Sequence, residues 1–167
     1  MTHHVVLMGV AGTGKSAVGK PLAGRLGADF AEGDDFHPPA NIEKMSSGTP
    51  LTDGDRWPWL RGLADWTRER TEAGRPTVVT CSALRRAYRD VLREAAPDTF
   101  FVHLVGTRTI ILDRMAGREH FAPASLLDSQ LATLEPLEQD EDGMTADISR
   151  PVQEIVDDVL ARLDQRS

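Results

Sequence analysis

The sequence is poor in cysteine, in positive charge and in long hydrophobic runs, and each scarcity excludes a class of protein. Cys81 is the one cysteine among 167 residues, so the chain has no intrachain disulfide and no Cys-x-x-Cys metal site. No apolar stretch reaches membrane-spanning length, and the first residues do not form a signal-peptide pattern. We therefore expect a cytoplasmic protein with no membrane partner, since a lone thiol also suits a reducing compartment.

Lysine and arginine together number 19 against 26 acidic residues, which gives a net charge of −7. Nucleic acids and anionic membranes select basic surfaces, so we expect no nucleic-acid partner. Apolar residues make up 40% of the chain and charged residues 27%, which is typical of a globular protein. The length predicts a single domain over residues 1–167.

What the sequence does contain, close to its start, is a phosphate-binding loop. Residues Gly9–Ser16 fit the pattern G-x-x-x-x-G-K-S. An apolar run precedes the loop and helix-like apolar spacing follows it, which is the strand–loop–helix setting that the motif requires. Lys15 is expected to reach the β- and γ-phosphates of ATP, and the Ser16 hydroxyl to bind Mg²⁺. The expected nucleotide contacts are Gly9, Val10, Ala11, Gly12, Thr13, Gly14, Lys15, Ser16 and Ala17. A glycine-rich turn that binds nothing is the alternative, and the flanking pattern disfavours it.

Short apolar runs alternate with amphipathic helical patterns along the rest of the chain. The expected strands are His4–Met8, Asp29–Ala31, Thr77–Cys81, Thr99–Val105 and Thr145–Ile148. This alternation predicts an α/β three-layer fold with a five-stranded parallel sheet flanked by helices. Ligands of such sheets bind beyond the carboxyl ends of the strands, so the residues that follow each strand are the candidates for function.

Three acidic residues follow the second expected strand. An extended segment would point Glu32 and Asp34 the same way and Asp35 away from them. Beside a triphosphate, one carboxylate can hold Mg²⁺ and another can accept the proton of an attacking hydroxyl. We therefore assign Glu32 with Ser16 to the metal and Asp34 to proton transfer, whereas Asp35 is expected to cap the next helix.

Arginines gather where a phosphoryl group or an acidic substrate would need them, because a guanidinium binds carboxylate and phosphate in a bidentate fork. Arg56 directly precedes Trp57, the first of three tryptophans in residues 57–66, and Arg86 and Arg89 follow the third expected strand. Arg118 lies in a segment between two helices that would close over the site as a lid. We expect Lys15 and Arg118 to stabilise the phosphoryl group in transfer.

Several segments together closely resemble gluconokinases of the small, thermoresistant type. The resemblance is carried by Gly33–Pro38, Asn41–Met45, Gly48–Leu51, Asp55–Leu60, Cys81–Leu84, Tyr88–Asp90, His120-Phe121, Ser129-Gln130 and Thr133–Glu135. It implies ATP-dependent, Mg²⁺-dependent phosphorylation of D-gluconate to 6-phospho-D-gluconate, a P-loop kinase fold similar to that of shikimate and nucleoside monophosphate kinases, and a possible homodimer. It also implies a substrate-binding helical segment at about residues 38–74 and a lid at about residues 114–123.

The resemblance completes the expected site. The catalytic residues are Lys15, Asp34 and Arg118. The residues expected at the substrate are Asp34, His37, Arg56, Ser82, Arg86, Arg89 and Gln130. Analogy with the fold places the adenine near Pro151. Two alternatives stay open at this point: another small-molecule kinase of the shikimate-kinase-like group, or a non-catalytic nucleotide-sensing protein.

Overall fold

The computed structural model describes residues 2–116 and 125–166. Within them the five strands form one parallel sheet in the order β2-β3-β1-β4-β5. The strands are β1 (His4–Met8), β2 (Asp29–Glu32), β3 (Thr77–Thr80), β4 (Phe100–Val105) and β5 (Gly143–Asp147). The five-stranded parallel sheet expected from the sequence is therefore confirmed.

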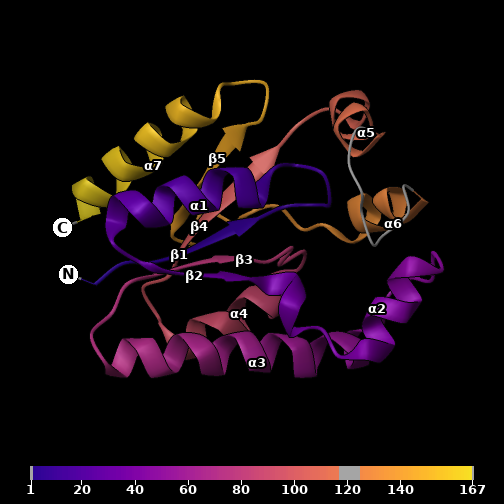
Figure 1. Ribbon diagram of the computed structural model, residues 1–167, viewed down its shortest axis with the longest axis horizontal. Helices are drawn as coiled ribbons and strands as arrows, with labels where there is room; N and C mark the ends of the chain where they lie inside the picture. Colours follow the sequence, from indigo (N-terminus) through magenta and orange to yellow (C-terminus); the bar gives the residue numbers. More distant parts are fainter. Residues whose placement is uncertain (1, 117–124, 167) are drawn as a thin grey trace.

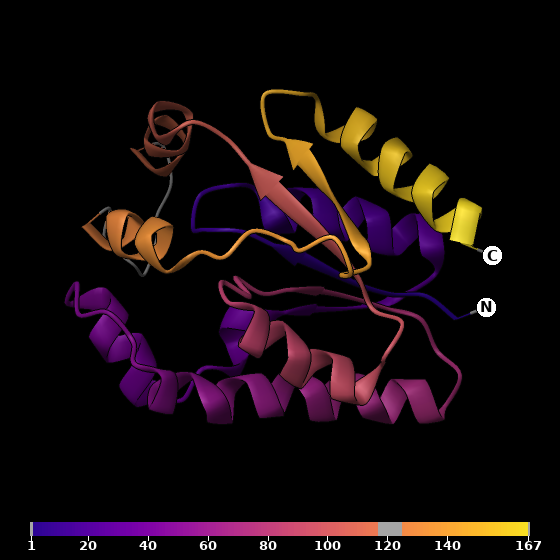
Figure 2. The ribbon, with the colours of Figure 1, turned by 180° about the vertical axis from the view of Figure 1, so that it is seen from behind.

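Helices cover both faces of this sheet. The helices are α1 (Lys15–Leu26), α2 (Pro39–Ser46), α3 (Asp53–Glu72), α4 (Arg86–Ala95), α5 (Arg108–Ala116), α6 (Ser125–Thr133) and α7 (Val152–Arg166). Helices α1 and α7 lie on one face and α3 and α4 on the other, while α2, α5 and α6 lie beyond the carboxyl ends of the strands (Figures 1 and 2). Every residue of β1 is buried because this strand lies at the centre of the sheet with helices on both sides. No helix in the described part of the chain is long and apolar enough to cross a membrane.

The bounds of β2 to β5 differ from the expected ones by one or two residues, and two of these differences have a clear physical reason. Strand β2 includes Glu32, which pairs with Thr80 of β3. Strand β5 begins at Gly143 instead of Thr145, because Gly143 and Met144 pair with β4. A Cβ at Gly143 would lie 2.3 Å from the Phe101 carbonyl oxygen, so glycine here permits a close backbone approach that a search for apolar runs overlooks.

The turn after β2 also differs from the expectation. Residues Gly33–Phe36 form a 3₁₀ helix and are not extended. Gly33 passes directly over β3, where its N–H donates to the Thr80 hydroxyl at 3.1 Å. A Cβ on Gly33 would lie 1.9 Å from the Thr80 carbonyl oxygen, so only glycine fits between the two strands.

This contact yields a stability prediction. Gly33→Ala forces β2 and β3 apart, and we expect it to lower the free energy of unfolding by about 3 kcal/mol, the upper end for overpacking a core. Gly24→Ala is the matched control, because Gly24 is exposed in α1 and a Cβ there meets nothing within 4 Å. That control should gain about 0.5–1 kcal/mol from helix propensity. Urea unfolding of both variants measures the difference, and equal stabilities would contradict the close approach.

Candidate functional site

The phosphate loop occupies the turn between β1 and α1. Gly9, Gly12 and Gly14 have φ values of 142°, 81° and 88°, a region that residues with a Cβ rarely adopt. A Cβ on Gly9 would lie 2.8 Å from the Leu104 carbonyl oxygen, and one on Gly12 would lie 2.7 Å from Met115. The two glycines of the motif, Gly9 and Gly14, and Gly12 between them are thus required by backbone conformation, and Gly9 and Gly12 also by close packing.

Lys15 lies in the first turn of α1 and folds back over the loop. Its Nζ donates to the carbonyl oxygens of Gly9 at 2.9 Å and Val10 at 3.0 Å. Burial lowers the pKa of the ammonium, whereas the Asp34 carboxylate nearby raises it. Lys15 thus spans the loop with its charge directed at the site where a triphosphate binds in this motif.

Glu32 lies between two hydroxyl groups at the end of β2. Its Oε2 accepts from Ser16 Oγ at 2.8 Å and from Thr80 Oγ1 at 2.9 Å. The Thr80 hydroxyl in turn accepts from the Gly33 N–H, so its own proton is directed at Glu32. A hydroxyl and a carboxylate oxygen are hard ligands that fit Mg²⁺. No group of three His, Cys, Asp or Glu side chains that could hold a metal ion occurs among the described residues, and Mg²⁺ commonly completes its shell with water and substrate phosphates.

Asp34 lies in the 3₁₀ turn beside an aromatic pair. Its Oδ1 is 4.0 Å from Nε2 of His37, and the His37 ring stacks on Trp59 with centroids 4.1 Å apart. The Asn41 amide N–H contacts His37 Nδ1 at 3.1 Å, which assigns the ring proton to Nε2. Burial and the nearby Arg56 charge lower the pKa of His37 to about 4. At neutral pH a neutral imidazole N–H therefore faces Asp34.

Trp59 of α3 holds the 3₁₀ turn Gly33–Phe36 in place. Its indole N–H donates to the Gly33 carbonyl oxygen at 2.8 Å, and its side chain is buried. Trp59 packs within the hydrophobic core. It also lines the cavity described below, which its position in a tryptophan-rich helix did not indicate.

Arg56 lies in the first turns of α3 and is 9% exposed. Its Nη1 donates to the Tyr88 hydroxyl at 2.9 Å, and Tyr88 donates a short hydrogen bond to Asp53. Asp53 also lies 3.9 Å from Arg56 and 3.6 Å from Arg85. The guanidinium is thus fixed by α4 and by its own helix while it forms part of the cavity wall.

Ser82 and Gln130 hold the phosphate loop from two sides. The Gly9 N–H donates to the Ser82 carbonyl oxygen at 3.2 Å. The Ala11 N–H donates to Gln130 Oε1 at 2.7 Å, which connects the loop to α6. Both side chains also line the cavity.

These groups surround one cavity of about 270 Å³ at the carboxyl ends of the strands. Its wall includes loop residues, acidic residues, Arg56 and an apolar side formed by α2, α6 and the segments next to them. The expected site residues that line it are Ala11, Gly12, Gly14, Lys15, Ser16, Glu32, Asp34, His37, Arg56, Ser82 and Gln130. Gly9, Val10 and Thr13 are buried and are not among the described residues that line it. The apolar side is formed by Met45, Pro50, Leu51 and Leu126.

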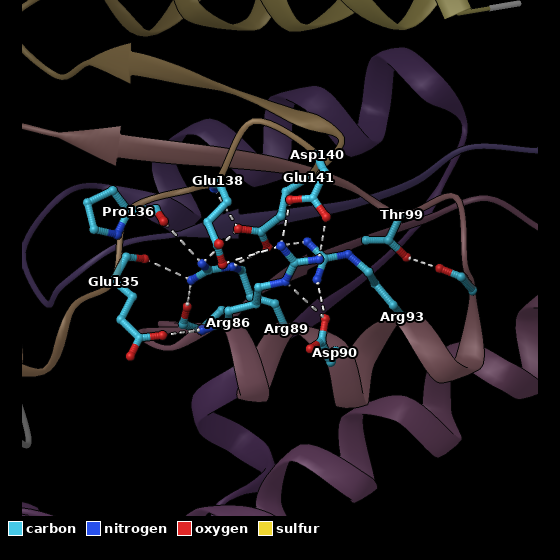
Figure 3. A network of polar contacts seen from close by, with 12 residues as sticks. Arg86, Arg89, Asp90, Arg93, Thr99, Glu135, Pro136, Glu138, Asp140 and Glu141 are labelled. Carbon is cyan, nitrogen blue, oxygen red and sulfur yellow. Dashed lines mark hydrogen bonds and ion pairs between the residues drawn. The ribbon is translucent and has the colours of Figure 1, made fainter.

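Arg86 and Arg89, which are expected at the substrate, do not appear among the described residues that line the cavity, and their role at the substrate stays a prediction. Figure 3 shows both in a network of polar contacts with Glu135, Glu138, Asp140 and Glu141. Arg86 forms a bidentate pair with Asp140 at 2.6 and 2.8 Å near the surface. The Arg89 side chain is 0% exposed, and its Nε donates to Glu141 at 2.7 Å. Their donors are thus directed at protein groups.

Three other expected residues have separate outcomes. Arg118 and residues 117–123 of the expected lid lie outside the described residues. Pro151 is exposed just before α7, and no contact in the structure tests its expected position beside the adenine. Ala17 is exposed in α1 and is absent from the described cavity wall.

Thr80 is, like Trp59, a residue at the cavity that sequence reasoning missed. It ends β3 beside the phosphate loop, where Leu7 of β1 is its partner in the sheet. A threonine in an apolar strand resembles any other β-branched residue, so its type gave no signal. Its position at the strand end, two residues before Ser82, was the one available indication.

The comparisons with known proteins agree with this geometry. A family described as an AAA domain matches residues 5–137. The chain is 56% identical to a gluconokinase of Gluconobacter oxydans, covering 82% of this chain and 78% of the relative. It is 43% identical to the thermoresistant gluconokinase of Escherichia coli, covering 92% and 90% of the two chains.

Solved structures give the same result. A sugar kinase from Janibacter superposes with a TM-score of 0.94 at 53% identity, covering 98% of this chain and 95% of the other. A gluconokinase from Sinorhizobium meliloti does so with a TM-score of 0.87 at 47% identity, covering 98% and 92%. A shikimate kinase from Aquifex aeolicus, with a TM-score of 0.67 at 16% identity over 98% and 97%, shows the shared P-loop kinase fold alone. Sequence, fold and relatives together show that the chain belongs to the gluconokinase family.

Proposed function

We propose that this chain transfers the γ-phosphoryl group of ATP to the terminal hydroxyl of D-gluconate, giving 6-phospho-D-gluconate and ADP. One observation carries the proposal: the cavity places the acidic Asp34 beside the phosphate-loop lysine and a fixed arginine, Arg56, in another part of its wall. An open-chain acid with a hydroxyl at the far end can present that hydroxyl to Asp34 and its carboxylate to Arg56. Membership of the gluconokinase family favours gluconate over other sugar acids.

In the proposed reaction the gluconate hydroxyl oxygen forms a bond to the γ-phosphorus while the bond to the β,γ-bridging oxygen breaks. Asp34 accepts the hydroxyl proton, and the neutral His37 N–H beside it orients the carboxylate or the substrate. Arg56 binds the substrate carboxylate, and Lys15 stabilises the charge on the transferring group. Mg²⁺, held by Ser16 and Glu32, would neutralise charge on the β- and γ-phosphates.

Further parts of the assignment belong to this proposal. Residues 38–74, which include α2 and α3, supply the acceptor side of the cavity. The segment that contains Arg118 acts as a lid that excludes water during transfer. A single domain, a homodimer and a cytoplasmic location stay predictions.

A substrate panel tests the function. ADP release is measured with gluconate, other sugar acids, shikimate and nucleoside monophosphates, and the phosphorylated carbon is located by NMR. We expect gluconate to give the highest kcat/KM, with phosphate on the terminal carbon. A preference for shikimate would move the chain to another kinase group, and ADP binding without turnover on any acceptor would indicate a nucleotide sensor.

Asp34→Asn tests the proton acceptor. The amide keeps the shape but cannot take the proton, so we expect kcat to fall about a hundredfold or more. ADP affinity, measured by calorimetry, should stay within about twofold of that of the native chain. Asp35→Asn is the matched control, because Asp35 is adjacent, exposed and absent from the described cavity wall. Full turnover in Asp34→Asn would rule out the assignment.

Thr80→Val tests the metal site. Valine has nearly the same shape but cannot donate to Glu32, and one lost hydrogen bond is worth about 1 kcal/mol. We expect the Mg²⁺ concentration for half-maximal rate, and the Mn²⁺ dissociation constant measured by electron paramagnetic resonance with ADP present, to rise about fivefold. Thr77→Val is the control, since Thr77 is buried on the same strand and contacts His4 far from the site. Equal metal constants in both variants would contradict a role for the Thr80 hydroxyl.

A further inference from the structure

The Arg89 side chain is completely buried, and each of its five N–H groups has an acceptor within the protein. Nε and Nη2 donate to the two carboxylate oxygens of Glu141 at 2.7 and 2.9 Å. Nη1 donates to the carbonyl oxygens of Ala83 at 2.9 Å and Glu135 at 3.0 Å, and Nη2 reaches that of Pro136 at 3.3 Å. Figure 3 shows Arg89 among the labelled residues Glu135, Pro136 and Glu141.

Glu141 supplies the charge that lets this arginine be buried. Burial raises the pKa of Glu141, but hydrogen bonds from Arg89, the Glu138 N–H and Arg93 outweigh that effect and lower it to about 2. The pair is therefore ionised at neutral pH. Buried ion pairs are often no more stabilising than apolar residues of similar size, so stability alone does not account for an arginine here. The three carbonyl contacts indicate what it does.

The first carbonyl belongs to the segment after β3. Ala83 has a φ of +46°, a left-handed conformation that costs a residue with a Cβ about 1–2 kcal/mol. The preceding residue, Ser82, accepts the hydrogen bond from the Gly9 N–H of the phosphate loop. Arg89 thus holds the strained Ala83, which adjoins Ser82. Ser82 and Gln130 both accept hydrogen bonds from backbone N–H groups of the phosphate loop.

The other two carbonyls belong to the segment that follows α6. The Glu135 N–H donates to the Leu84 carbonyl oxygen at 2.6 Å, so this segment is joined to the segment after β3. One turn earlier, Gln130 accepts from the Ala11 N–H at 2.7 Å. The same guanidinium therefore fixes both segments that bracket the phosphate loop, one at Gly9 and one at Ala11.

We propose that Arg89 is a positioning residue for the phosphate loop, which sets the spacing between Ser82 and Gln130 and thereby the loop conformation that binds the triphosphate. Arg89 does not touch substrate and acts through backbone carbonyls. The proposal rests on the nucleotide-binding part of the proposed function and is independent of the identity of the acceptor.

Arg89→Lys tests the proposal, because lysine keeps the charge beside Glu141 but cannot reach the three carbonyls in a planar fork. We expect the ADP dissociation constant and the KM for ATP to rise about tenfold, the worth of one or two hydrogen bonds, with the KM for gluconate within about twofold. Arg93→Lys is the matched control, since Arg93 pairs with the same Glu141 from the same helix. It should leave all three constants within about twofold, whatever it does to the melting temperature.

The outcomes separate positioning from general stability. A fall in melting temperature with unchanged nucleotide constants in Arg89→Lys, or an equal rise in the KM of both substrates, overturns the proposal. If Arg89→Lys does not fold, Glu141→Gln decides the matter, because the amide keeps the shape of Glu141 but lacks the charge and the second acceptor that fix the Arg89 guanidinium. A rise of about threefold or more in the ADP constant supports positioning, and a smaller change overturns it. ADP binding is measured without acceptor, so failure of the gluconate assignment does not affect this test.

Discussion

Parallel pairing of the five strands is the constraint on which the site depends, because it brings every strand end to one edge of the sheet. The register decides which side chains meet there. Leu7 and Glu32 both pair with Thr80, from opposite sides of β3. The phosphate loop that follows β1 therefore starts beside the carboxylate that ends β2, and Ser16, in the first turn of α1, reaches Glu32 at 2.8 Å. The sheet register therefore brings together Ser16 and Glu32, the two residues that hold the metal in the proposed mechanism.

The charged groups of the cavity are held in place by hydrogen bonds to other parts of the protein. Lys15 and Arg56 are each held by protein acceptors, so neither cation needs to reorganise its surroundings when an anionic ligand arrives. His37 stays neutral because burial and Arg56 lower its pKa to about 4. A neutral imidazole adds a hydrogen-bond donor beside Asp34 without adding a charge that would raise the cost of transferring a proton to that carboxylate.

The sequence predicted the phosphate loop, the parallel sheet and the place of Glu32 and Asp34, because local motif and strand order determine them. The reasoning for Asp34 was partly wrong, since the turn is a 3₁₀ helix and not extended, yet both carboxylates line the cavity. The arginines could not be ranked, because their roles depend on contacts distant in sequence. Arg56 lines the cavity, whereas Arg89 is engaged by Glu141, 52 residues away.

A crystal structure of this chain with gluconate, Mg²⁺ and a non-hydrolysable ATP analogue would test most directly how the cavity orients its two substrates. We expect the terminal hydroxyl within hydrogen-bond distance of the Asp34 carboxylate and in line with the γ-phosphate, with the gluconate carboxylate on Arg56. Gluconate bound in the reverse direction, with its carboxylate at the phosphate loop, would contradict this expectation. So would a triphosphate bound away from Lys15.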